Sequence, residues 1–284
     1  MQLPSTDGVK IAVHDLGGTG PALLIAHANG FHGRCYIPLA QALSHDAHSV
    51  AFDLRGHGDT ARPEGDVSWR AYADDAQAIA SWLVARGGGP IDAFGHSLGA
   101  TCLLMVAHRQ PGLIRRIVAF EPIVHPSPAA IGEALDDAIG DVENPMVAGA
   151  RRRRDSFPSY EAALARFSAR PPLNAFTPAA LEAYVRFGFA EGAGKVHLKC
   201  TPDTEASTYA TARSNAAWDL LPDIQAEVLV VSGRVEPAQP SAVAHEVAAR
   251  LPKGRYLQLD ELDHFGPMTH PLELAAIISK ELAR

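Results

Sequence analysis

The chain of 284 residues has few cysteines and no long apolar run. Its three cysteines, Cys35, Cys102 and Cys200, have neither metal-ligand spacing nor the pattern of a disulfide framework, which indicates a reducing compartment. No apolar stretch is long enough to cross a bilayer, and the first residues lack the apolar region of a signal peptide. We therefore expect a cytoplasmic protein that does not engage a membrane.

The chain also lacks an excess of positive charge and the common metal and cofactor motifs. Its net charge of −7 and its pI near 6.0 argue against a nucleic-acid-binding surface. Neither an H-E-x-x-H motif nor a glycine-rich phosphate loop is present, so we expect no metal and no cofactor. With 47% hydrophobic residues the chain can bury a sizeable core. We expect a monomer or homodimer that binds a small molecule.

Short apolar runs alternate with longer helical patterns through most of the chain. The run Ala22–Ala26 has the uniform apolar character of a central parallel strand. Strands are predicted at residues 9–16, 22–26, 48–54, 90–94, 113–120, 228–232 and 255–259. Helices are predicted at residues 36–43, 69–86, 100–109, 241–251 and from residue 271 onward. This alternation predicts an α/β fold with a parallel sheet.

Residues 122–215 break this alternation. They are rich in alanine, arginine and proline, and they lack clear buried strands. Helical patterns occur at residues 129–139, 160–169 and 178–187, and the accompanying aromatic residues argue against a disordered linker. We predict a helical cap inserted after the strand that ends at Phe120, so that residues 1–121 and 216–284 form the core.

The pentapeptide Gly95–Gly99 has the pattern G-x-S-x-G, in which a sharp strand-to-helix turn exposes a serine hydroxyl. A strand is predicted before it and a helix after it, as the motif requires. The glycines leave space that a Cβ would occupy in so tight a turn. We predict that Ser97 is a nucleophile.

A serine nucleophile needs a base, and the base needs an acid that orients it. His264 follows the strand at 255–259 and precedes the last helix, which places it at the carboxyl end of the sheet. His270 is a rival, but His270-Pro271 is typical of a helix start. Glu121 and Glu236 each follow a predicted core strand, and the residues alone leave the choice of acid between them open.

Acyl transfer also requires donors for a developing oxyanion. One is predicted to be the backbone N–H of Leu98, the residue after the nucleophile. The loop after the strand 22–26 supplies the second, for which we favour the N–H of Asn29. Phe31 and His32, in the same loop, are predicted to bind substrate.

Together these motifs resemble the α/β-hydrolase superfamily. The resemblance is carried by His27-Ala28-Asn29-Gly30-Phe31, Asp53-Leu54-Arg55-Gly56-His57-Gly58-Asp59, Gly95–Gly99 and His264-Phe265-Gly266-Pro267. It implies an α/β-hydrolase fold, with a mostly parallel eight-stranded sheet flanked by helices and an inserted helical cap. It also implies hydrolytic chemistry without a cofactor.

A subgroup that includes a peroxisomal lipase type and fungal acyl-CoA hydrolases is similar at Phe120-Glu121-Pro122 and at residues 152–157 and 196–200. That resemblance implies Glu121 as the acid. The commoner superfamily pattern falls on residues 233–240 and implies Glu236, so we favour Glu121 and keep Glu236 as the alternative. The chain departs from the family at Ala28, where glycine is usual, and its last residues are no peroxisomal signal.

Four consecutive arginines, Arg151–Arg154, lie in the predicted cap. Successive residues of a helix turn by about 100°, so on a helix the four would point in different directions and most would be solvated. The alternative is that one of them, for which we choose Arg154, holds a substrate carboxylate or the phosphates of an acyl-CoA.

The residues favour a serine hydrolase that cleaves a carboxylic ester or thioester through an acyl-enzyme. Carbon–carbon bond hydrolysis and cofactor-free perhydrolysis or haloperoxidase chemistry are alternatives, because one fold supports several reactions. A non-catalytic receptor for a small ligand is the alternative of another class. The sequence does not identify the acyl group or the leaving group.

Overall fold

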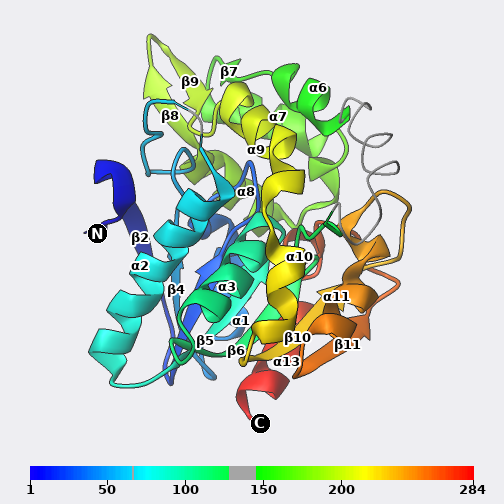
Figure 1. The fold of residues 1–284 in the computed structure, drawn as a ribbon. Helices are drawn as coiled ribbons and strands as arrows, with labels where there is room; N and C mark the ends of the chain where they lie inside the picture. The colour runs from blue at the N-terminus through cyan, green and yellow to red at the C-terminus, as the bar shows by residue number, and fades with distance from the viewer. Residues whose placement is uncertain (66, 128–144) are drawn as a thin grey trace.

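Eight strands form one sheet in the computed structural model, which describes residues 1–65, 67–127 and 145–284 (Figure 1). In spatial order they are β1 (Gln2–Pro4), β2 (Lys10–Gly17), β4 (His48–Phe52), β3 (Ala22–Ala26), β5 (Ile91–His96), β6 (Ile114–Phe120), β10 (Glu227–Ser232) and β11 (Gly254–Gln258). The pairs β1–β2 and β2–β4 are antiparallel and the remaining pairs are parallel. The predicted α/β class with a mostly parallel sheet is confirmed.

Helices cover both faces of the sheet and create two apolar cores. Alternate residues of a strand point to opposite faces, so Leu24 joins one core while Leu23 and Ile25 join the other. The first core packs against α2 (Trp69–Gly87), α3 (Leu98–Arg109), α10 (Ala217–Leu220) and α11 (Ala244–Arg250). The second packs against α1 (Ile37–Ala42) and α13 (Pro271–Leu282), which lie behind the sheet in Figure 1. None of the described helices has both the length and the apolar character to span a membrane.

Most core elements lie within a few residues of their predicted positions. The strand predicted at 22–26 is β3, and the helix predicted at 69–86 is α2. The helix predicted at 241–251 begins as a short 3-10 turn, and its α-helical part is α11. The helix predicted at 129–139 lies outside the described residues.

Residues 122–215, here called the connecting segment and described at 122–127 and 145–215, differ from their prediction. This segment contains the helices α6 (Pro145–Arg151), α7 (Tyr160–Ser168), α8 (Pro178–Gly188) and α9 (Pro202–Ala210). It also contains a three-stranded antiparallel sheet of β7 (Ser156–Phe157), β9 (Lys195–Leu198) and β8 (Phe189–Gly192). The sequence showed helical patterns and no clear buried strand here, and it did not reveal these three strands, because strands of two to four residues are too short to produce a readable period.

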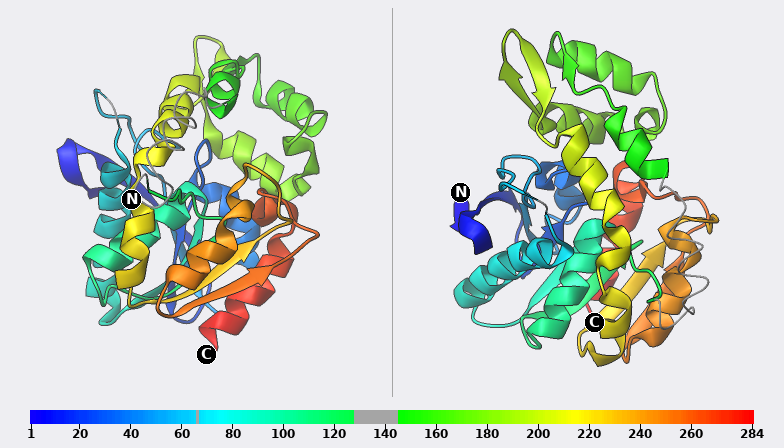
Figure 2. Two further views of the ribbon diagram at one scale, coloured as in Figure 1. Left: turned by 45° about the vertical axis from the view of Figure 1, so that its right-hand side comes forward. Right: turned by 45° about the horizontal axis from the view of Figure 1, so that its top comes forward.

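The connecting segment lies over one end of the central sheet (Figure 2). Residues from both parts line one cavity near the ends of β3 and β5, which identifies this end as the carboxyl end of the parallel strands. The proposed division into a core and a cap at these boundaries stays a prediction.

A buried ion pair fixes the loop that follows β4. Arg55 and Asp75 are 1% and 0% exposed at their side chains, and Arg55 Nη2 lies 2.7 Å from Asp75 Oδ1. Arg55 also donates to Asp7 and Thr6, which attaches the N-terminal residues to the same point. The pair links this loop to α2.

We predict that Asp75→Ala lowers the free energy of unfolding by about 3–5 kcal/mol, because it leaves the buried Arg55 charge without its main partner. The adjacent variant Asp74→Ala is the control. Asp74 pairs with Arg109 where both side chains are one quarter exposed, so its loss costs less than about 1 kcal/mol. Urea unfolding followed by circular dichroism measures both, and equal effects would contradict the assignment.

Candidate active site

Ser97 occupies a strained turn between β5 and α3. Its backbone has φ 55° and ψ −116°, a conformation that non-glycine residues rarely adopt. A Cβ at Gly95 would lie 2.5 Å from Ala100 Cα, and one at Gly99 would lie 2.3 Å from the Ala26 carbonyl oxygen. The turn therefore requires both glycines, and it packs α3 directly against the end of β3.

Ser97, His264 and Glu121 form a continuous hydrogen-bond chain. Ser97 Oγ lies 3.2 Å from His264 Nε2, and His264 Nδ1 lies 2.6 Å from Glu121 Oε2. The other Glu121 oxygen accepts from the backbone N–H of Gly233 at 2.8 Å. This carboxylate is 1% exposed, so it holds the imidazole with Nδ1 protonated and leaves Nε2 free to accept from the serine hydroxyl.

The other candidate residues for acid and base lie elsewhere. Glu236 is exposed at the surface and pairs with Arg234, the two side chains being 48% and 59% exposed. His270 is exposed at the start of α13, where its Nδ1 contacts the Thr269 hydroxyl. Only Glu121, of the two acids predicted, is brought to His264.

Asn29 and Leu98 both line the cavity at Ser97. Among the described residues, no hydrogen bond uses the backbone N–H of either one, whereas the N–H of Ala28 is taken by Tyr36 Oη at 3.2 Å. Leu98 is the first residue of α3, where backbone donors lack helical partners. The Asn29 side chain is held from two sides, since its amide donates to the Glu205 carbonyl and its oxygen contacts His57 Nε2.

A hydrogen-bond chain below Ser97 joins three parts of the site. The backbone of Ala28 donates to Tyr36, Tyr36 Oη lies 2.8 Å from His96 Nδ1, and His96 Nε2 lies 2.8 Å from the backbone oxygen of His264. Because a carbonyl only accepts, His96 donates from Nε2 and accepts the Tyr36 proton at Nδ1. Three parts are therefore held at fixed separations: the loop of residues 27–33 after β3, here called the oxyanion loop for its predicted role, the strand-to-helix turn Gly95–Gly99, here called the elbow, and the His264 loop.

Ser97 and His264 line a cavity of about 350 Å³, here called the serine cavity. Its walls come from the core loops and from the connecting segment. The larger side chains that line it are mainly apolar or aromatic: Phe31, Trp69, Leu98, Ile123, Val124, Met146, Tyr209, Val243 and Phe265. Such a lining fits a medium-sized apolar acyl group.

A second cavity of about 400 Å³, here called the arginine cavity, adjoins the first. The two share Asn29, Phe31, Met146, Tyr209 and Phe265. Its arginines are Arg152, Arg153, Arg154, Arg166 and Arg170. The expectation that Arg151–Arg154 fan around one helix was wrong, because α6 ends at Arg151 and the next three residues all reach this cavity.

The predicted substrate-binding residues lie in different surroundings. Phe31 is buried and lines both cavities. Arg154 lines only the arginine cavity, where its guanidinium lies 4.6 Å from the centre of the Phe157 ring. His32 is 3% exposed and lines neither cavity, since the loop directs its ring inward against Tyr184 and Cys35.

A larger hollow of about 900 Å³ lies at the opposite end of the sheet. It is lined by the residues that begin β3, β4 and β5, namely Ala22, His48 and Ile91. Parallel α/β sheets bind their ligands at the carboxyl ends of the strands, so we assign the chemistry to the serine cavity.

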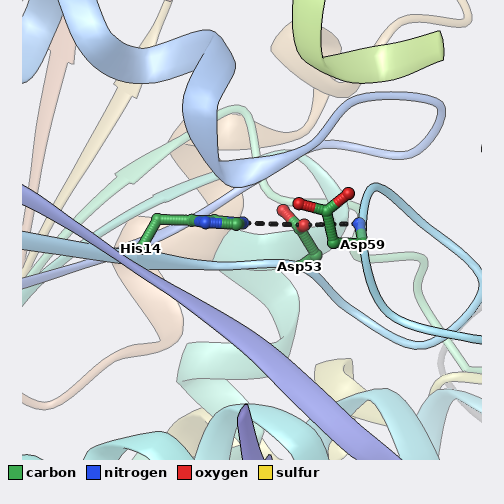
Figure 3. A group of neighbouring side chains, drawn as sticks. All are labelled: His14, Asp53 and Asp59. Carbon is green, nitrogen blue, oxygen red and sulfur yellow. Dashed lines mark hydrogen bonds and ion pairs between the residues drawn. The ribbon is translucent and has the colours of Figure 1, made fainter. Parts of the chain in front are cut away.

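His14, Asp53 and Asp59 form a compact group outside both cavities, with potential ligand atoms within 4.8 Å of one another (Figure 3). Asp53 Oδ2 lies 2.8 Å from His14 Nε2 and 2.7 Å from the Asp59 N–H, and Asp53 Oδ1 accepts from the Gly33 N–H. Because its oxygens already bind these donors, Asp53 ties the oxyanion loop to the loop after β4.

Burial keeps three histidines next to the site neutral, namely His27, His32 and His96. Burial lowers the pKa of His27 to about 3 and that of His32 to about 4, and it lowers the pKa of His96 well below 6.5. The hydrogen bonds of His27 agree with a neutral ring, since Nδ1 faces the Ala28 carbonyl and Nε2 accepts from the Leu54 N–H. Protonation of Nε2 would remove that second bond.

Comparison with known proteins agrees with this architecture. The sequence profile of the alpha/beta hydrolase family matches residues 23–277, which include the elbow, Glu121 and His264. The chain belongs to the alpha/beta hydrolase family. A solved peroxisomal alpha-beta-hydrolase from Saccharomyces cerevisiae has a TM-score of 0.79 at 16% identity, covering 99% of this chain and 84% of that one. That likeness shows a shared fold.

Curated relatives of this hydrolase match it over different lengths. The 2-(acetamidomethylene)succinate hydrolase of Mesorhizobium japonicum is 36% identical over 104 residues, which cover 37% of this chain and 36% of that protein. The matches to the first such relatives span about a third of their length. The lipase LipV of Mycobacterium tuberculosis is 26% identical over 282 residues, covering 96% of this chain and 98% of that protein.

Sequence reasoning did not find several residues of the site. Tyr36 lies just outside the motif that ends at Phe31, and Glu205 is more than a hundred residues from it, so only the folded chain shows that both contact the oxyanion loop. Arg166 and Arg170 were not singled out, because they are single arginines at the end of a helical pattern. Their spacing of four residues, which can place two side chains on one helix face, is the one signal that could have linked them.

We predict that the free energy of unfolding falls as the pH is lowered from 7.5 to 5.0. Unfolded histidines bind protons below about 6.5 whereas His27, His32 and His96 stay neutral when folded, so the unfolded state gains protons and stability is lost with acid. Each histidine contributes about 2 kcal/mol over this range. Urea unfolding at each pH measures the change.

The matched variant is His27→Asn, whose amide can both donate and accept. It should reduce the pH slope by about one proton relative to the parent chain, whatever it does to absolute stability. An identical slope in parent and variant would contradict the neutral state assigned to His27.

Proposed function

We propose that this alpha/beta hydrolase cleaves carboxylic esters or thioesters through an acyl-enzyme on Ser97. The observation that carries the proposal is the unbroken chain Ser97 Oγ–His264 Nε2 and His264 Nδ1–Glu121 Oε2. A serine hydroxyl is a poor nucleophile until a base accepts its proton, and this arrangement supplies the base together with the group that orients it.

Each residue has a defined part in the reaction. Ser97 Oγ attacks the acyl carbon while its proton moves to His264 Nε2, and Glu121 stabilises the imidazolium that forms. The N–H groups of Asn29 and Leu98 donate to the tetrahedral oxyanion. His264 then gives the proton to the leaving alcohol or thiol, and the acyl group remains on Ser97.

Deacylation repeats the steps with water. His264 takes a proton from a water molecule, the hydroxide attacks the acyl carbon, and Ser97 leaves with the proton returned by His264. We further propose that the connecting segment acts as a cap over the carboxyl end of the sheet. Its residues Met146 and Tyr209 line the serine cavity and would contact the acyl group.

The relatives support hydrolysis but do not identify the kind of bond that is cleaved. LipV is named as a lipase and matches nearly the whole chain, which favours an ester. The name of the relative 2-(acetamidomethylene)succinate hydrolase contains no ester. It therefore favours a second candidate function, in which the same residues hydrolyse a carbon–carbon bond.

We predict that Glu121→Gln lowers kcat on an ester substrate by about 10³- to 10⁴-fold, because the amide cannot hold His264 in its productive tautomer. Ser97→Ala should remove the acyl-enzyme entirely. The control is Glu236→Gln, which changes an exposed carboxylate of the alternative acid position and should alter kcat by less than about twofold. Steady-state kinetics on paired esters and thioesters measures these effects.

Three results would change the assignment. A large loss in Glu236→Gln with none in Glu121→Gln would reverse the acid. Turnover of a vinylogous diketone acid without turnover of esters or thioesters would favour carbon–carbon bond hydrolysis. Tight ligand binding without turnover would favour a non-catalytic receptor.

A further inference from the structure

The arginine cavity concentrates positive charge in a protein whose net charge is −7. Five arginines line it, and Glu205 is the single carboxylate among its described lining residues. Glu205 is already paired with Arg153, whose guanidinium also donates to Tyr184 Oη. The Arg153 guanidinium is therefore fixed in place and pre-oriented.

Two separate parts of the connecting segment supply three more of these arginines, while the Arg154 side chain is already hydrogen-bonded to the Ser156 carbonyl. Arg152 follows the end of α6, Arg166 lies in the last turn of α7, and Arg170 follows that helix. The side chains of these three make no ion pair or hydrogen bond with any other described residue; Arg152 and Arg170 are exposed, and Arg166 is half-buried. Guanidinium groups gathered around one cavity repel one another, and an anion bound between them replaces that repulsion with attraction.

The cavity is also close to the reaction centre. A Cβ at Gly30 would lie 3.2 Å from Arg153 Nη1, so this arginine contacts the loop that carries Asn29. Phe31 and Phe265 belong to the walls of both cavities. The two cavities therefore meet at these rings, and a substrate that occupies both would place its acyl carbon at Ser97 and its far end in the arginine cavity.

We propose that the arginine cavity is a subsite for an anionic group of the substrate, a carboxylate or a phosphate, while Ser97 attacks the acyl carbon of the same molecule. The planar fork of arginine matches the oxygens of both groups. The inference rests on the proposed function, because it assigns the charge of the substrate on which Ser97 acts.

Paired substrates, one anionic and one neutral in each pair with the same reacting acyl bond, test the subsite and identify its source. Monoethyl succinate is compared with ethyl 4-methylpentanoate, in which an isopropyl group replaces the carboxylate. Butyryl-coenzyme A is compared with the butyryl thioester of N-acetylcysteamine, which lacks phosphates. The variants are Arg166→Gln/Arg170→Gln and, separately, Arg152→Gln. Arg186→Gln is the control, because Arg186 is exposed on α8 and stacks on Tyr160 away from both cavities.

The double variant should raise KM at least about tenfold for the anionic member of one pair and leave the neutral member within about twofold, as expected for lost charge-assisted hydrogen bonds. Loss on monoethyl succinate identifies a carboxylate, and loss on butyryl-coenzyme A identifies a phosphate. Equal losses on the charged and neutral members, or no loss on any of them, would overturn the proposal.

A second measurement separates this proposal from the proposed function. If the parent chain hydrolyses none of the four substrates, the function fails, and calorimetry then tests the subsite with succinate and with pyrophosphate. Binding of either anion to the parent chain that weakens at least about tenfold in Arg166→Gln/Arg170→Gln, and not in Arg186→Gln, supports the subsite. Absence of binding, or equal binding to all three proteins, would overturn it.

Discussion

The site depends on three neighbouring parallel strands that end at the same edge of the sheet. The pairing continues past the strand ends, since the Ser97 N–H donates to the Phe120 carbonyl and the Glu121 N–H donates to the Val231 carbonyl, both at 2.9 Å. These two backbone hydrogen bonds fix the backbone of the serine relative to that of the acid without any side-chain contact. Glu121 has a φ of 44°, a strained value that this pairing maintains while the carboxylate reaches His264 and Gly233.

A second set of interactions holds the loops that the sheet does not reach. Asp53 accepts hydrogen bonds from Gly33 and Asp59, and the buried Arg55 next in this loop is paired with Asp75. The chain from Ala28 through Tyr36 and His96 ends at the backbone of His264. Buried polar groups are costly unless they are satisfied, so these networks define one arrangement of the oxyanion loop and the base.

The sequence predicted the parts of the site that local rules determine. The elbow was found because G-x-S-x-G stands between a strand and a helix, and His264 because it follows the last strand. The acid stayed open between Glu121 and Glu236, because both follow core strands and only the register of β6 beside β10 decides which one faces His264. The inward rotation of His32 depends on its packing against Tyr184, a residue more than a hundred positions away.

The arginine cavity shows why a run of like residues is hard to interpret. The direction of each side chain in Arg151–Arg154 depended on where α6 ends, and helix ends are the least predictable feature of a sequence. Arg166 and Arg170 line the cavity because of how the connecting segment packs, and no local sequence pattern predicts that packing. The active-site motif and the charge beside it were therefore predictable to very different degrees.

Intact mass spectrometry after treatment with a fluorophosphonate tests the central claim most directly, because this reagent captures only an activated serine. The account predicts a single covalent adduct on the parent chain and none on Ser97→Ala. An unmodified parent chain that is correctly folded, or an adduct that persists in Ser97→Ala, would contradict the assignment of Ser97 as the nucleophile.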